Sequence, residues 1–167
     1  MKGAEGRLQS DSERSVFFIN VDSYATGIDI EVSLPETHIW PELGDRTRLT
    51  ADFCYSGAFY CIVDAEELGF HGLKSADLGA LSRAAGKLKS LLNGKPRYRG
   101  LFHRPDKSEL RTLYGVIVRG SNKGFVPEGV DGAELGVCFF GSGQQVDRSP
   151  CGSGSAARRA LAHAKHR

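Results

Sequence analysis

The 167-residue chain has no apolar run near the roughly 18 residues that span a bilayer, so no segment is predicted to cross a membrane. Its first 14 residues are polar and charged and lack the apolar centre of a signal peptide. The four cysteines form no Cys-x-x-Cys pair and no zinc-ligand spacing. A formal net charge of +2 calls for no nucleic acid, membrane surface or acidic partner. We therefore expect a cytoplasmic protein without disulfides, bound metal or cofactor-specific motif.

The composition is that of an ordinary globular protein. Hydrophobic residues make up 40% and charged residues 25%, and the length suits one domain with a real core. The 21 glycines indicate many turns and a fold rich in strands. We predict a flexible lead-in at residues 1–14 and a single domain at residues 15–167.

Six apolar or alternating segments have the length of strands. In segment 27–34 every second residue is apolar, the period-two pattern of a half-buried strand. Segments 47–53 and 58–63 flank Gly57 and are predicted to form a hairpin or a bulged pair. The predicted strands are 15–21, 27–34, 47–53, 58–63, 112–118 and 135–140, and they form a curved antiparallel sheet.

Two helices are predicted. Leucine and alanine recur at helical spacing from Leu78 to Leu92, with Ser75 as the expected N-cap and Asn93-Gly94 as the stop. The alanine-rich segment 152–166 is a second helix that follows directly on Cys151. The predicted class is α+β, with a curved antiparallel sheet, one outer helix, and one helix that begins where the candidate chemistry lies.

The most informative segment is Asp-Arg-Ser-Pro-Cys-Gly-Ser-Gly at residues 147–154. Pro150 fixes its own φ and holds the preceding residue extended, so Cys151 is expected to be presented rigidly. Gly152 and Gly154 allow backbone N–H groups to approach a ligand closely. The first turn of the following helix carries unpaired N–H donors and a partial positive charge.

This geometry predicts a site for an α-amino acid. A substrate carboxylate can bind the N–H groups near Gly152 and Ser153, and the same field favours a thiolate at Cys151. Asp147 supplies the opposite charge for an ammonium group. Two alternatives stay open from the residues alone: a small cysteine in a tight turn, or a phosphate loop, although the Lys and Ser/Thr of a Walker motif are missing.

The same segment, residues 147–154, resembles the signature around the second catalytic cysteine of the proline racemase family. That family comprises proline racemases, 4-hydroxyproline 2-epimerases and trans-3-hydroxy-L-proline dehydratases. Segments 51–65, 113–118 and 136–140 are also similar to family segments, and they occur in the expected order. The resemblance therefore covers most of residues 15–167.

The resemblance implies a diaminopimelate epimerase-like α+β fold and a two-base reaction without pyridoxal phosphate or metal. One cysteine removes the α-proton of proline or hydroxyproline, and a second thiol protonates the opposite ring face. By motif position, Cys151 is one catalytic thiol of the pair and Asp147 contacts the substrate nitrogen. Gly152 and Ser153 then offer backbone contacts to the carboxylate, and Phe140 packs against the substrate.

Two departures from the family pattern shape the expectation. No Met-Cys-Gly-His-like segment carries a second catalytic cysteine, so residues 15–167 are expected to be an incomplete domain that supplies one of two bases. Residue 151 is cysteine where the dehydratase branch has threonine, which favours a racemase or epimerase, although the flanking segments are closer to that branch. The alternatives are a trans-3-hydroxy-L-proline dehydratase or a truncated, non-catalytic amino-acid-binding domain. A homodimer is a possible assembly.

The other polar clusters have simpler interpretations. His163 and His166 could share a metal, but a solvated basic helix end is the better interpretation. The basic segment 95–104 could bind nucleic acid, yet arginine and aromatic residues without a fold motif are weak support. The remaining cysteines, which are Cys54, Cys61 and Cys138, are expected to be packing residues.

Overall fold

The computed structural model describes residues 21–103, 111–120, 135–140, 145–147 and 151–166. The predicted lead-in, the first six residues of predicted strand 15–21, and Pro150 lie outside the described residues. In the described part of the chain, no helix is both long enough and apolar enough to cross a membrane.

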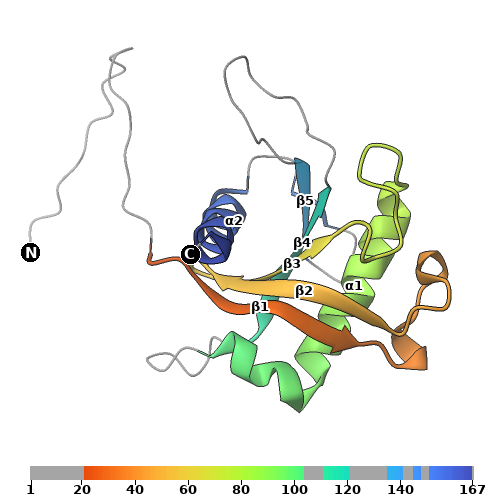
Figure 1. The fold of residues 1–167 in the computed structure, drawn as a ribbon, viewed down its shortest axis with the longest axis horizontal. Coiled ribbons are helices and arrows are strands. Elements are labelled where there is room, and N and C mark those ends of the chain that lie inside the picture. Colours follow the sequence, from red (N-terminus) through yellow and green to blue (C-terminus); the bar gives the residue numbers. More distant parts are fainter. Residues whose placement is uncertain (1–20, 104–110, 121–134, 141–144, 148–150, 167) are drawn as a thin grey trace, which may run out of the picture.

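The described residues form one open five-stranded sheet whose spatial order follows the sequence (Figure 1). The strands are β1 (Tyr24–Ser33), β2 (Arg48–Tyr55), β3 (Phe59–Asp64), β4 (Leu113–Gly120) and β5 (Leu135–Phe139). The predicted α+β class is confirmed. The expected antiparallel pairing is wrong at one place, because β3 and β4 run parallel. Parallel neighbours need a long crossover, and helix α1 (Leu78–Gly94) supplies it.

The predicted hairpin is confirmed. β2 and β3 pair antiparallel, with Tyr55 opposite Phe59 at the turn. Gly57 has φ of 92°, a conformation that residues with a Cβ rarely adopt. The turn therefore depends on glycine at this position, and it brings Ser56 beside the start of the second helix.

The N-cap of helix α1 lies two residues later than expected. Asp77, not Ser75, is the N-cap, because its carboxylate accepts a hydrogen bond from the Ala80 N–H at 2.7 Å. A carboxylate in this position satisfies one of the unpaired N–H groups of the first turn. The apolar face of α1, including Leu81, Leu88 and Leu92, is buried against the sheet.

Helix α2 (Gly152–Lys165) matches the predicted second helix, and Cys151 is its N-cap. The C-terminal end of α2 is held by ion pairs. The Lys165 Nζ lies 3.0 Å from the buried carboxylate of Asp52 and 2.8 Å from that of Asp29. Asp29, at φ of 51°, lies at a register shift of β1 and donates its own N–H to Asp52 at 2.9 Å.

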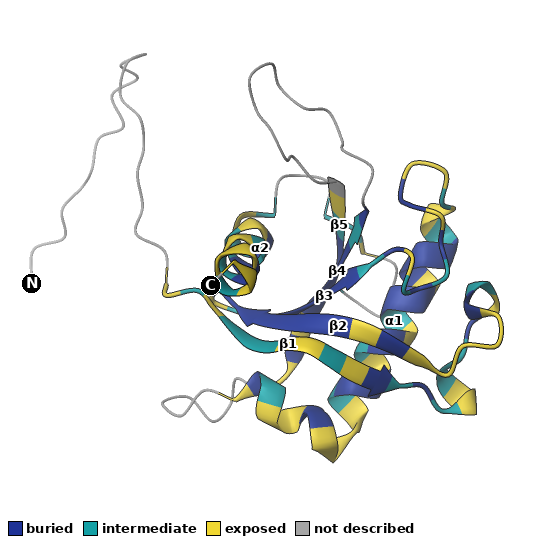
Figure 2. Cartoon of the chain, viewed as in Figure 1, coloured by how far each residue is buried: buried dark blue, intermediate teal, exposed yellow. Residues whose placement is uncertain are grey.

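The two long helices cover opposite faces of the sheet (Figure 1). The α1 side holds the larger core, which combines the α1 leucines with one face of every strand. Figure 2 shows this core as a dark band through the middle strands and α1. The α2 side holds a second, smaller cluster, whose buried members are Cys54, Tyr60, Ile62, Ile117, Cys138, Ala157 and Leu161.

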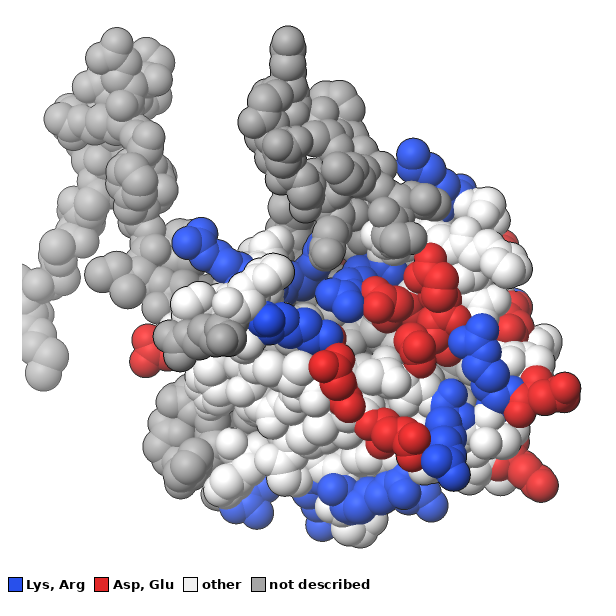
Figure 3. Space-filling view, viewed as in Figure 1, with Lys and Arg blue, Asp and Glu red and all other residues white. Residues whose placement is uncertain are grey.

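The basic segment 95–104 is partly helical. Residues Pro96–Phe102 form a 3-10 helix, η3, and the side chains of Tyr98 and Phe102 are buried rather than displayed. Phe102 packs edge-on against Phe53 and Phe59 of the sheet. On the face seen in Figure 3, acidic side chains lie among the basic ones over the middle and right of the view, and basic side chains lie along its lower edge. These aromatic rings therefore belong to the core rather than to a base-stacking surface.

Candidate active site at the start of α2

Cys151 lies where the last connection of the chain enters α2. It is half-buried and its sulfur is a free thiol. Its carbonyl accepts the first helical hydrogen bond, from the Ser155 N–H at 2.7 Å, while its φ and ψ of −65° and 102° are extended. The thiol is thus attached at the end of the helix where N–H groups point outward and the macrodipole is positive.

Residues 145–147 pair with the end of β5, so Asp147 lies close to Phe140. The N–H of Asp147 donates to the Cys138 carbonyl at 3.0 Å, and the N–H of Phe140 donates to the Gln145 carbonyl at 3.0 Å. An isolated bridge between Phe139 and Val146 closes this return. Phe140 and Cys151 both pack against the α2-side cluster. Phe140, Asp147 and Cys151, which the sequence analysis assigned to one site, therefore lie around the first turn of α2.

Cys138 lies between these groups. Burial is the main cause that raises the pKa of its thiol above the ordinary value, and the neighbouring Cys151 and Asp147 raise it further. The side chain is 5% exposed and faces α2. Cys138 is therefore a protonated neighbour of Cys151 rather than a second exposed thiol.

Tyr60 reaches the site from β3. Its side chain is completely buried, and its hydroxyl lies 2.6 Å from the Ser153 Oγ and 4.0 Å from the Cys151 Sγ. Burial is the main cause that raises the pKa of Tyr60, whereas the hydrogen bond with Ser153 lowers it. The phenol is thus held neutral beside the thiol.

Two glycines make room for this arrangement. A Cβ at Gly115, opposite Tyr60 in the β3–β4 ladder, would lie 3.1 Å from the Tyr60 ring and 3.3 Å from the Cys138 sulfur. A Cβ at Gly154 would lie 2.8 Å from the Cys151 sulfur. Gly152 differs, because a Cβ there would meet no atom within 4 Å. The space beside the Gly152 Cα is open, and Gly115 and Gly154 leave space for the side chains of the site.

An aromatic row leads from the site to the surface. The Tyr60 and Tyr114 rings meet edge-on with centroids 5.9 Å apart, and Tyr114 and Phe140 follow at 5.1 Å. Lys89 of α1 fixes this edge by donating to the carbonyls of Tyr114 and Phe140. Tyr114 is 51% exposed, so an apolar wall is open to solvent next to the thiol.

The sequence indicated five site residues, and the structure places all of them at this end of α2 and β5. Phe140 and Asp147 follow β5, Cys151 is the N-cap, and Gly152 and Ser153 begin the helix. Ser153 makes two further polar contacts: its Oγ lies 2.6 Å from the Tyr60 hydroxyl, and its backbone carbonyl accepts a hydrogen bond from the Ser56 hydroxyl at 2.6 Å.

Sequence reasoning missed Ser56 and Tyr60, whereas the prediction that Cys138 is a packing residue is confirmed by its burial. Alternation along β3 could have indicated Tyr60, since Phe59 and Cys61 face α1 and the residue between them must face the other helix. No local pattern indicates Ser56, whose partner is 97 positions away in the sequence.

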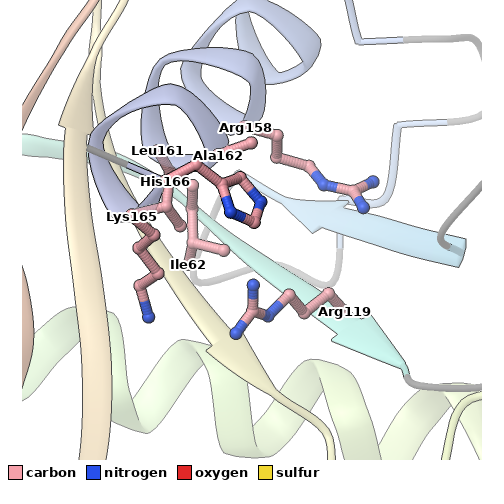
Figure 4. Close-up of a pocket in the computed structure, with 7 residues that line it drawn as sticks. All are labelled: Ile62, Arg119, Arg158, Leu161, Ala162, Lys165 and His166. Carbon is pink, nitrogen blue, oxygen red and sulfur yellow. The ribbon is translucent and has the colours of Figure 1, made fainter. Parts of the chain in front are cut away.

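A separate cavity of about 150 Å³ lies near the other end of α2 (Figure 4). Two of its charged side chains have partners within the fold. Arg119 binds Asp64, with an NH2-to-oxygen distance of 3.0 Å, and Lys165 binds Asp52. The lining residues are Ile62, Arg119, Arg158, Leu161, Ala162, Lys165 and His166. The cavity contains neither Cys151 nor Asp147 and is distinct from the candidate site.

Comparisons with known proteins agree with this architecture. A family model described as proline racemase matches residues 3–167. The chain is 31% identical over 155 residues to a trans-3-hydroxy-L-proline dehydratase of Bacillus thuringiensis, covering 93% of this chain and 40% of that protein. It is 30% identical over 152 residues to a proline racemase of Clostridioides difficile, covering 91% and 39% of the two chains.

A solved structure gives the same picture. A hydroxyproline epimerase from Agrobacterium vitis, with bound trans-4-hydroxy-L-proline, superposes with a TM-score of 0.65 at 27% identity. The superposition covers 89% of this chain and 37% of the epimerase. The chain thus spans about 40% of the length of the curated relatives it matches.

Proposed function

The chain belongs to the proline racemase family, and from that premise we propose that it carries one of two proton-transferring thiols acting on proline or hydroxyproline. The named relatives of the family are enzymes that include racemases, an epimerase and dehydratases. In this proposal the thiol is that of Cys151 and the reaction is inversion at the α-carbon without a bound cofactor.

The observation that carries the proposal is the position of Cys151 as the half-buried N-cap of α2, beside Asp147 and Phe140. The amides of the first turn, at Gly152 and Ser153, suit a carboxylate. Asp147 supplies a negative charge for the ring nitrogen. The ring of Phe140 offers an apolar surface for the methylene groups of the substrate. These four functions are what a cyclic α-amino acid requires.

The proton transfer follows from this placement. A Cys151 thiolate takes the α-proton, so an S–H bond forms as the C–H bond breaks. The electron pair stays on the α-carbon and delocalises into the carboxylate, whose charge the helix amides stabilise. A second acid then protonates the opposite face of the ring. Residues 1–167 contain no Met-Cys-Gly-His-like segment that would supply this acid as a second cysteine.

Dehydration of trans-3-hydroxy-L-proline is the second candidate function. The dehydratases among the relatives favour it, as does the similarity of the flanking segments to that branch. The same first step would apply, with loss of hydroxide from the ring instead of reprotonation. Cysteine at residue 151, where that branch has threonine, favours inversion, because inversion needs an acid on each face of the ring.

The proposal is tested by protection of Cys151 from alkylation. We expect millimolar L-proline or trans-4-hydroxy-L-proline to slow modification of Cys151 by iodoacetamide, read by peptide mass spectrometry. Pyrrolidine lacks the carboxylate and cyclopentanecarboxylate lacks the amine, so both should protect less.

Asp147→Asn is the matched variant. It should keep the alkylation of free Cys151 measurable and lose most of the protection by proline, because only the charge for the ring nitrogen is removed. Equal alkylation rates with and without every amino acid would contradict the proposal.

A further inference from the structure

Tyr60 is a buried polar side chain that the proposed proton transfer does not use. It is completely buried among apolar neighbours of the α2-side cluster, where phenylalanine would fill the same space without a hydroxyl to satisfy. Its hydroxyl points at the first turn of α2, between the Ser153 Oγ at 2.6 Å and the Cys151 Sγ at 4.0 Å. The polar end of the ring therefore meets the two residues at which the helix begins.

The space for this hydroxyl is provided by the neighbouring strand. Gly115 leaves the Tyr60 ring room on the α2 face, since any Cβ there would lie 3.1 Å from it. On the other side, the edge-on contact with Tyr114 fixes the plane of the ring. The phenol can rotate its O–H but cannot move away from the thiol.

We propose that Ser153 and Tyr60 form a hydroxyl relay that ends on Cys151 and stabilises its thiolate. In the ionised state the Ser153 hydroxyl donates to Tyr60, and the Tyr60 hydroxyl donates to the sulfur. Both are positioning residues that act through Cys151. This inference rests on the proposed function, because it assigns the control of the same thiol.

The direction of each hydrogen bond in the relay is set by the single proton that each hydroxyl can donate. Each hydroxyl has one proton to donate, and a thiolate is a charged acceptor that binds a donor more strongly than a thiol does. When Cys151 is protonated, the Tyr60 hydroxyl can donate to Ser153. When Cys151 ionises, the Tyr60 hydroxyl donates to the sulfur instead. Burial raises the pKa of Tyr60, so the phenol keeps its proton throughout the range in which a cysteine titrates.

Other titratable groups surround the thiol. Cys138 of β5 contacts Cys151, and its buried thiol also stays protonated. Asp147, after β5, raises the pKa of the Cys138 thiol by its negative charge, and Lys89 of α1 lowers it. The hydroxyl oxygens of Tyr60 and Ser153 lie 2.6 Å apart, a separation typical of a strong O–H···O hydrogen bond.

The test is the alkylation rate of Cys151 against pH, measured by peptide mass spectrometry without substrate. Tyr60→Phe should slow alkylation near neutral pH about threefold to tenfold, the range expected for the net contribution of one ordinary hydrogen bond. At high pH, where the thiolate forms without help, the wild-type and variant rates should converge. Ser153→Ala should slow the neutral reaction less, and it should add nothing to Tyr60→Phe in the double variant.

The control variants remove a tyrosine hydroxyl and a serine hydroxyl on the other side of the sheet. Tyr98→Phe and Ser82→Ala delete buried hydroxyls on the α1 side, far from the thiol, and should leave the pH profile unchanged. If Tyr60→Phe does not fold, Ser153→Ala and Ser153→Thr decide, because threonine keeps the hydroxyl and should restore the rate.

Three outcomes would overturn the relay. These are an unchanged neutral rate in Tyr60→Phe, an equal loss at neutral and high pH, and additive losses in the double variant. The measurement needs no amino acid, so the relay can fail while proline still protects Cys151. Equally, protection can fail while the relay holds.

Discussion

The two faces of the sheet are built differently. On the α1 side, eight residues of the helix are buried, and nearly all are leucine or alanine. On the α2 side, three residues of the helix are buried, namely Gly154, Ala157 and Leu161. Polar contacts hold both ends of α2 on the sheet. Lys165 forms them at one end, and the hydroxyls of Ser56, Tyr60 and Ser153 form them at the other.

The α1 side therefore contributes mainly to the stability of the fold, and the α2 side holds the groups of the candidate site. Apolar burial on the α1 side scales with the buried area and is non-directional, so it can hold the sheet in place. The α2 side has less apolar area, but each hydrogen bond fixes a particular atom relative to the Cys151 sulfur. A change on the first face should therefore alter unfolding, and a change on the second should alter the thiol.

Truncating a leucine on each face compares the two cores. Leu88 of α1 is fully buried and Leu161 of α2 is 3% exposed. We expect Leu88→Ala to lower the free energy of unfolding by about 4 kcal/mol and Leu161→Ala by about 2 kcal/mol, because the smaller cluster can relax into the space. Urea denaturation measures both. Equal losses would show that the two faces contribute alike to stability.

Removing the anchor of α2 should cost less stability than truncating Leu88. Asp52 is 4% exposed and receives both the Asp29 N–H and Lys165. Asp52→Ala should lower the free energy of unfolding by about 2 kcal/mol, less than a fully buried pair would, because the Lys165 side chain is 28% exposed and can turn to solvent.

Glu31→Ala is the control for this anchor. It breaks the exposed Arg48 pair at 3.2 Å and should change stability by less than about 0.5 kcal/mol. A similar loss in both variants would show that the burial of Asp52 is unimportant.

The buried thiols should make stability depend on pH. Burial raises the pKa of the Cys54 thiol to about 12 from 9.0, and that of Cys61 higher still. Below pH 9 both states keep these protons. As pH rises above 9, the unfolded chain loses them while the folded chain does not, so the free energy of unfolding falls.

Cys54→Ala should reduce this fall by about 1 kcal/mol per pH unit above pH 9, which is the contribution of one thiol. Urea midpoints at pH 8, 9 and 10 provide the measurement, with Cys151→Ala as a comparison at a half-exposed position. An identical pH dependence for wild type and Cys54→Ala would show that this thiol ionises in the folded protein.

The sequence predicted what is local in the molecule. Apolar and alternating segments predicted α1 and the five described strands, the alanine-rich segment predicted α2, and the 147–154 motif predicted the candidate site. It did not predict the parallel pairing of β3 with β4, which depends on where α1 returns the chain. It placed the α1 cap at Ser75, because serine and Asp77 both suit an N-cap and only the path of the backbone selects one.

The missed site residues have distant partners. Tyr60 meets Ser153 across 93 positions of sequence, and no pattern within either segment records the other. The room that Gly115 leaves for the Tyr60 ring depends on the register of two strands separated by α1. Pairings of this kind are fixed by the assembled fold, whereas the motif that begins α2 is contiguous.

A titration with L-proline followed by amide chemical shifts in two-dimensional NMR tests whether the start of α2 is an amino-acid site. The account predicts saturable shifts centred on the N–H groups of Gly152, Ser153 and Gly154 and extending to Asp147, with the α1-side amides unmoved. Saturable shifts centred on another part of the chain, or none at millimolar proline, would contradict it.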